Sequence, residues 1–181
     1  MILVYINSTG GVSKASLEAV SYANKLGDVL VVTNGSSASD DLASMGSYGA
    51  SKVLVDRAVS GDDQQQITRM VAEVAESNGA DTVVFVHDQY GKSVAPMLSA
   101  RMKAGLVSGA ISLPDGEGAI AVNVFSGKAI GKVKVHSSSK VISLLPNSMP
   151  PEETGSTCAV EEITTQSGEA SIKVLETKKP D

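Results

Sequence analysis

Residues 82–113 read TVVFVHDQYGKSVAPMLSARMKAGLVSGAISL, and the order of elements within them defines the fold class. The first five residues form a short apolar run that predicts a buried strand. A helix is predicted next, because Val94, Leu98 and Met102 recur on one helical face. The chain then turns into a second apolar run that starts at Leu106. Strand, helix and strand in this order are typical of a parallel sheet.

The same alternation of strands and helices is predicted throughout the first 113 residues. Helical periodicity is seen at residues 19–26, 40–45 and 67–75, between short runs rich in β-branched residues. These runs are Ile2–Ile6, Val29–Val32, Lys52–Val55 and Thr82–Val86. We therefore expect an α/β fold with an open, mainly parallel sheet and helices on both faces, in three α/β/α layers like those of nucleotide-binding domains.

After Leu113 the connections become too short for helices. Strands are predicted at Ala119–Phe125, Ala129–Val135 and Lys140–Leu145, joined as hairpins. A small antiparallel extension of the sheet is the expected result.

Residues 146–155 are rich in proline and polar residues and read as a linker. We place the α/β domain at residues 1–150, and a linker with a two-strand tail at residues 151–181. The tail strands are predicted at Val160–Ile163 and Ile172–Glu176. Two short strands bury too little surface to fold alone, so they should add to a sheet edge, their own or a partner's. A frayed terminus is the alternative.

Composition excludes several classes of protein. The 15 basic and 20 acidic residues give a net charge of −5, without a basic cluster of the kind that binds nucleic acid. The single cysteine, Cys158, cannot form an internal disulfide, and no Cys/His spacing suggests a metal site. No apolar run approaches the roughly 20 residues needed to span a bilayer. We expect a soluble, cytoplasmic protein with no metal and no membrane insertion.

Three loops should meet at the carboxyl edge of the parallel strands: Asn7–Gly11, Thr33–Ser36 and His87–Lys92. Their glycine, serine and asparagine residues let the backbone approach a ligand and donate hydrogen bonds. Ordinary turn chemistry explains the same composition, and neither glycine-rich nucleotide motif is present. The nucleotide-loop candidates are Asn7, Ser8, Asn34, Gly35, Gly91 and Lys92.

His87 and Asp88 are adjacent and could form a proton-transfer pair. Neighbouring strand residues point to opposite faces, however, and no nucleophile accompanies them. We predict no catalytic residue, and a hydrolase built around His87 ranks last among the functions considered.

The stretch Gly91-Lys92-Ser93-Val94-Ala95-Pro96-Met97-Leu98-Ser99-Ala100-Arg101-Met102, followed by Gly105-Leu106-Val107, resembles the alpha subunit of electron transfer flavoprotein. That family has a glycine and a polar pair before Leu-Ala-Pro-Arg, then Ala-Ala-Arg-Leu and a Gly-Leu strand start. Phe125-Ser126-Gly127-Lys128-Ala129 matches the family's aromatic-Gly-Gly-Asn-Ala turn. The likeness covers most of residues 1–150 in motif order. Met97 and Gly109 depart from it, where the family usually has arginine and aspartate.

The resemblance implies an electron carrier subunit and no enzyme. In that family, electrons pass from acyl-CoA and related dehydrogenases of fatty acid beta-oxidation to a membrane quinone reductase, through FAD in an alpha–beta heterodimer. This segment would be the N-terminal scaffold and subunit-interface domain, with Arg101 and Phe125 as contacts to the beta subunit. The family's Ser-Gly-Gly-Arg-Gly flavin loop is not in this sequence, so FAD is not expected on this chain alone. AMP would belong to the beta subunit.

A second hypothesis is a stand-alone adenine-nucleotide-binding module that resembles universal stress proteins and uses the three loops. A saturable ATP shift without a partner would favour this hypothesis. Co-purification with a beta subunit would favour the flavoprotein. Whether the chain is a truncated alpha subunit or a free-standing relative stays open at this point.

Overall fold

A computed structural model describes residues 1–176 and 178. Its strands are β1 (Ile2–Asn7), β2 (Val29–Asn34), β3 (Ala50–Asp56), β4 (Thr82–Val86), β5 (Gly105–Ala110), β6 (Ala119–Val124), β7 (Ala129–Lys134), β8 (Lys140–Leu144) and β9 (Ala159–Glu162). Its helices are α1 (Lys14–Asn24), α2 (Ser39–Ala43), α3 (Gln64–Ser77) and α4 (Gln89–Met102), with the 3-10 helix η1 (Ser44–Tyr48) after α2.

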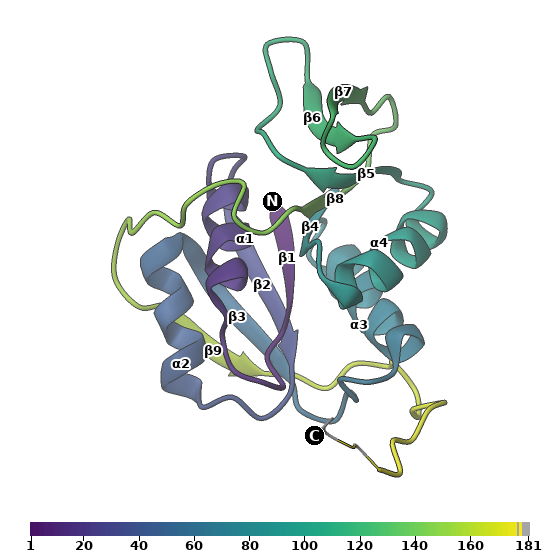
Figure 1. Ribbon diagram of the computed structural model, residues 1–181. Helices are drawn as coiled ribbons and strands as arrows, with labels where there is room; N and C mark the ends of the chain where they lie inside the picture. Colours follow the sequence, from purple (N-terminus) through teal and green to yellow (C-terminus); the bar gives the residue numbers. More distant parts are fainter. Residues whose placement is uncertain (177, 179–181) are drawn as a thin grey trace.

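The strands form one sheet in the order β7-β6-β5-β8-β4-β1-β2-β3-β9. The seven neighbouring strands β5, β8, β4, β1, β2, β3 and β9 run parallel. Strands β6 and β7 are antiparallel additions beside β5. Helices α1 and α2 cover one face, and α3 and α4 cover the other (Figure 1). The predicted three-layer α/β fold with a mainly parallel sheet is confirmed.

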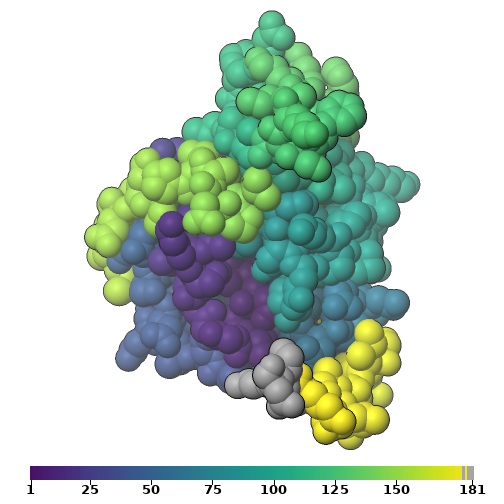
Figure 2. All heavy atoms as spheres, in the orientation of Figure 1, coloured from purple at the N-terminus to yellow at the C-terminus, as the bar shows by residue number. Residues whose placement is uncertain are grey.

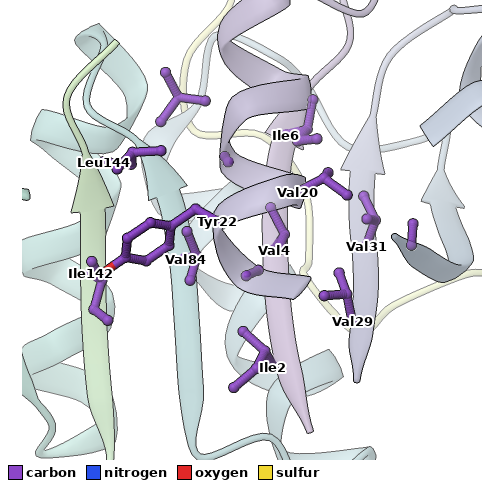
Figure 3. Packing of buried hydrophobic residues seen from close by; sticks show 14 of the residues in the cluster. Ile2, Val4, Ile6, Val20, Tyr22, Val29, Val31, Val84, Ile142 and Leu144 are labelled. Atoms are coloured by element: carbon purple, nitrogen blue, oxygen red, sulfur yellow. The ribbon is translucent and has the colours of Figure 1, made fainter. Parts of the chain in front are cut away.

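Successive residues of β1 alternate between two hydrophobic cores. Val4 and Ile6 pack under α1, whereas Leu3 and Tyr5 pack under α3 and α4. Figure 3 shows the first core, with the Tyr22 ring of α1 reaching across to β8. Because a central strand is buried on both faces, its sequence is a continuous apolar run.

The position of β8 corrects the expected hairpin. Lys140–Leu144 does not pair with the preceding strand but lies between β4 and β5, parallel to both. Its residues Val141 to Leu144 are buried on both faces. The short connection after β7 therefore did not determine which strands became neighbours.

The segment after β8 crosses the outside of α1. The Asn147 backbone N–H donates to Glu18 Oε2 at 2.8 Å, and Lys25 Nζ lies 2.6 Å from Glu152 Oε1. Glu18 is a buried residue of α1, so this crossing covers a carboxylate as well as apolar surface. The crossing carries the chain from one half of the sheet to the other edge.

Strand β9 pairs in parallel with β3, so the first predicted tail strand does add to an edge of its own sheet. The second predicted strand is wrong: Ile172–Glu176 forms no strand and is exposed. The end of the predicted tail, residues 177 and 179–181, lies outside the described residues. Within the described part of the chain, no helix is both long and apolar enough to cross a membrane.

Candidate functional site

The sheet has a topological switch point between β1 and β4. From β1 the chain builds β2 and β3 on one side, and then crosses to place β4 on the other. Ligands of open α/β sheets bind in the crevice at the carboxyl ends of such strands. The predicted nucleotide candidates lie at this edge, but only two of them are in loops. Asn7 and Asn34 end β1 and β2, Ser8 and Gly35 follow these strands, and the predicted loop at Gly91 and Lys92 is instead the start of α4.

The candidates at the end of β1, Asn7 and Ser8, form hydrogen bonds with neighbouring backbone groups. Asn7 Oδ1 accepts from the Thr9 N–H at 3.0 Å, and Asn7 Nδ2 donates to the Gly61 carbonyl at 3.3 Å. The buried Ser8 donates through Oγ to the Asn34 carbonyl at 2.5 Å. These contacts favour a structural role for both residues.

The candidates after β2 are also held by the protein. Asn34 is fully buried, accepts the Tyr5 hydroxyl at 2.9 Å and donates to the Val59 carbonyl at 3.4 Å. At Gly35, where φ is +102°, an added Cβ would lie 2.8 Å from the Thr9 backbone nitrogen. This glycine lets two loops approach each other closely, which a larger residue would prevent.

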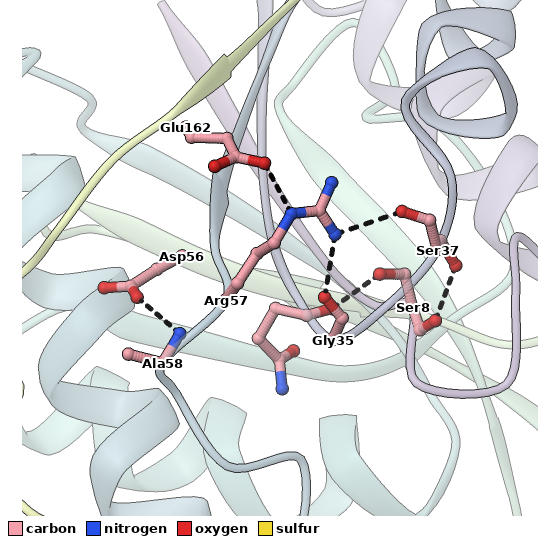
Figure 4. A network of polar contacts seen from close by, with 8 residues as sticks. Ser8, Gly35, Ser37, Asp56, Arg57, Ala58 and Glu162 are labelled. Atoms are coloured by element: carbon pink, nitrogen blue, oxygen red, sulfur yellow. Dashed lines mark hydrogen bonds and ion pairs between the residues drawn. The ribbon is translucent and has the colours of Figure 1, made fainter.

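Arg57, which the sequence did not single out, locks the same loop. Its Nη1 donates to the carbonyls of Gly35 and Ser37 at 3.2 and 3.1 Å, and its Nε donates to Glu162 Oε1 at 2.6 Å (Figure 4). The guanidinium group therefore ties the β2 loop to β9. The role of Arg57 could not be predicted from the sequence, because all its partners are at least 20 residues away in the chain.

The N-terminus of α4 is capped by the carboxylate of Asp88. Asp88 Oδ1 accepts the N–H groups of Tyr90 and Gly91, both at 2.9 Å. A phosphate at this terminus would need these same donors and would meet a carboxylate instead. Lys92 is exposed one residue further on. The structure thus places Gly91 and Lys92 together at the predicted edge, but with the anion position filled.

The crevice at the switch point is small. It is lined by Tyr5, Asn7, Ser13, Phe85 and Asp88 among others, and its volume is about 30 Å³. Pockets for small ligands usually measure about 300–1,000 Å³. The volume of this crevice is about a tenth of the lower end of that range.

A larger groove of about 460 Å³ lies away from the carboxyl edge, between α3 and strands β3 and β9. Lys52 Nζ and Glu161 Oε2 form an ion pair at 2.9 Å across its β3–β9 side. Leu30, Leu54 and Val74 are among its apolar lining residues. Its charged side chains, Lys52, Glu73 and Glu161, are already paired or bonded to the chain, so they do not define a ligand.

His87 is placed by a neighbour that the sequence did not suggest. Its Nδ1 lies 2.9 Å from the hydroxyl of Ser143 in β8, and that hydroxyl accepts the Gly109 N–H at 3.2 Å. Burial, together with the charge of Lys92, lowers the pKa of His87, against an opposing effect of Asp88. Ser143 is only 1% exposed and therefore inaccessible as a nucleophile. This arrangement fixes the β4–β8–β5 edge and supports no hydrolytic site.

The described residues bring together no group of three or more His, Cys, Asp or Glu side chains that could hold a metal ion. Cys158 is a free thiol, and burial raises its pKa.

The β6–β7 hairpin presents an exposed aromatic residue in a strained backbone conformation. Phe125 and Ser126 have φ values of +51° and +56°, and the Gly127 N–H donates to the Val124 carbonyl at 3.1 Å, as in a type I′ turn. Such a turn favours asparagine or glycine, and a bulky residue in this region is a genuine outlier. The Phe125 side chain is 80% exposed, so packing within the chain does not compensate the strain. Phe125 as a partner contact therefore stays a prediction.

The same hairpin is basic and apolar. Its residues 119–134 contain three lysines and no acidic residue, although the whole chain has a net charge of −5. Ile130 in β7, the edge strand, is 68% exposed. Lys132 donates to Asp115 at 2.8 Å, and mainly this bond lowers the pKa of Asp115 to about 2. The sequence analysis did not single out Ile130, which lies on the same face of β7 as Lys132 and Lys134.

Arg101, the second predicted partner contact, is exposed in the last turn of α4. It lines a groove of about 340 Å³ with Glu76 and Met102. Its exposure agrees with an interface role but does not test it.

The sequence matches the model of a known family over almost all of the α/β domain. The match to "Electron transfer flavoprotein domain" covers residues 2–168. The chain is 30% identical over 134 residues to the electron transfer flavoprotein subunit alpha of Bacillus subtilis, which covers 68% of this chain. It is also 30% identical over 132 residues to that of Syntrophomonas wolfei, covering 70% of this chain.

These alignments span only 40% and 41% of the two relatives, respectively. The family match and the two alignments confirm the resemblance inferred from Gly91–Met102 and the hairpin turn, for the part of the relatives that this chain matches. The chain belongs to the electron transfer flavoprotein family, as an N-terminal domain of the alpha-subunit type.

Proposed function

We propose that this chain is the N-terminal scaffold and subunit-interface domain of an electron transfer flavoprotein alpha subunit. The family match over residues 2–168 carries this proposal. In the proposed complex, electrons pass from acyl-CoA and related dehydrogenases to a membrane quinone reductase through FAD. The chain contributes a rigid platform and a beta-subunit contact, and performs no chemical step.

The geometry of the carboxyl edge supports a platform role. Asp88 fills the anion position of α4, and the switch-point crevice of about 30 Å³ is too small for a nucleotide. We place FAD outside this domain and AMP in the beta subunit. No feature of the crevice favours the stand-alone nucleotide-binding module.

The hairpin supports the interface role. Phe125 and Ile130 are exposed apolar side chains on a hairpin with three lysines. Aromatic side chains are enriched among the residues that contribute most to binding at protein interfaces. We assign this surface to a beta subunit that presents an apolar patch with acidic residues around it.

Co-expression tests this function. The tagged chain should retain an untagged beta subunit of the family in a one-to-one complex, whereas the chain alone should be colourless and should show no thermal shift with AMP, ATP or FAD. A yellow chain purified without a partner, or a beta subunit that is not retained, would contradict the proposal.

A further inference from the structure

The segment that follows β9 is attached to the domain through side chains of β3 and α3. It leaves the sheet after Glu162 and passes beside α3, where Figure 1 draws it in yellow. Ile163 packs against the apolar core on that side. Beyond Ile163 the attachment is polar and involves mainly the segment's backbone.

The first attachment is made by Asp56, at the end of β3. Its Oδ2 accepts the backbone N–H of Thr165 at 2.8 Å and the Thr165 hydroxyl at 2.7 Å. Its Oδ1 accepts the Ala58 N–H at 3.0 Å, as Figure 4 shows. Asp56 is only 2% exposed, so this carboxylate is a buried acceptor with three donors.

The middle of the segment lies along one side of α3. Gln66 Nε2 donates to the Gly168 carbonyl at 2.7 Å, and Arg69 donates to the carbonyls of Ser167 and Glu169. Glu73 Oε2 accepts the backbone N–H of Gln166 at 2.7 Å. Ser167 is 3% exposed, although it lies in a segment without regular structure.

The last attachment is made by Asp63, which also caps α3. Its Oδ1 accepts the N–H groups of Gln65 and Gln66 at 2.9 and 3.0 Å, while its Oδ2 accepts the N–H of Ser171. The side chain is fully buried. One carboxylate oxygen thus caps α3, and the other binds the backbone of the segment.

The chain changes character immediately after Ser171. Ile172 and Val174 are each 48% exposed, and Leu175 is 89% exposed. Among the described residues, the Ser171 N–H is the last backbone group that α3 holds. The boundary between held and unheld chain therefore lies between residues 171 and 172.

We propose that residues 164–171 form a strap, fastened to β3 and α3 by Asp56 and Asp63, that moves with the α/β domain. Among the described residues, Ser171 is then the last one fastened to the domain, and a hinge toward a flavin-holding domain would begin after it. The statement about a following domain rests on the proposed function, whereas the fastening itself does not.

Amide exchange by NMR on this chain tests the strap without a partner or cofactor. The amides of Thr165, Gln166 and Ser171 should exchange at least about tenfold more slowly than those of residues 172–176. Equal exchange rates in these two groups would overturn the proposal, whatever the outcome of the beta-subunit experiment.

Asp63→Asn separates the strap from the helix cap. Asparagine is an equally good N-cap through its Oδ1, but it offers an N–H2 group where Ser171 needs an acceptor. We expect the Ser171 amide to exchange about tenfold faster, with the Gln66 amide unchanged. Asp62→Asn is the matched control, because Asp62 is exposed and adjacent.

Asp56→Asn gives a second, independent reading at the other end of the strap, where the Thr165 amide should lose protection. If Asp63→Asn and Asp62→Asn gave the same exchange rate at Ser171, the fastening would be refuted. A Thr165 amide unaffected by Asp56→Asn would refute it at the first attachment.

Discussion

Gly91→Ala should destabilise the domain by about 3 kcal/mol or more. An added Cβ would lie 1.8 Å from the carbonyl oxygen of Val86 and 2.9 Å from its carbon. Both atoms are backbone, so neither can rotate away. Alanine would gain about 1 kcal/mol of helix propensity, which is too little to offset moving α4 away from β4.

Urea denaturation followed by circular dichroism measures this effect, with Gly10→Ala as the control. A Cβ at Gly10 would meet nothing within 4 Å, so that variant should stay within about 0.5 kcal/mol of the parent. A Gly91→Ala protein as stable as Gly10→Ala would show that helix and strand are not in the close contact described.

Phe125→Asn should weaken beta-subunit binding by about tenfold or more without destabilising the chain. Asparagine suits the left-handed conformation of this turn position, so the strain at φ +51° should fall. Loss of an aromatic contact and gain of turn stability are opposite effects of one substitution. A role within the fold alone would not produce this combination.

Calorimetric titration of the beta subunit gives the affinity, and the midpoint of thermal unfolding gives the stability. Ser126→Asn is the matched control, since Ser126 has φ +56° in the same turn and its replacement keeps Phe125. Equal affinities of Phe125→Asn and Ser126→Asn would remove Phe125 from the interface.

Local periodicity predicted much of the fold. Runs such as Ile2–Ile6 and Thr82–Val86 are strands because both of their faces are buried, and this shows in sequence as unbroken apolar residues. The placement of β8 was not predictable, since its neighbours β4 and β5 are distant in sequence. The prediction of a second tail strand was wrong because side chains of α3 hold the preceding segment along the helix, away from a sheet edge.

The candidate site was predicted less well than the fold. The loops do meet at the carboxyl edge, but composition could not distinguish a ligand donor from a buried structural residue. Asn34 bonds to Tyr5, which lies 29 residues away, and Arg57 bonds to Glu162, which lies 105 residues away. Phe125 was identified only through the family resemblance, whereas its strained backbone became visible in three dimensions.

We propose that the domain is a partner-binding platform with a closed carboxyl edge. Hydrogen exchange mass spectrometry of the chain, free and after addition of either the beta subunit or AMP, tests this proposal against nucleotide binding at that edge. We expect the amides of β7, Ala129–Lys134, to exchange about tenfold more slowly with the beta subunit, and no change at Asn7–Gly11 with AMP. Protection of Asn7–Gly11 by AMP alone, with β7 unaffected by the beta subunit, would contradict it.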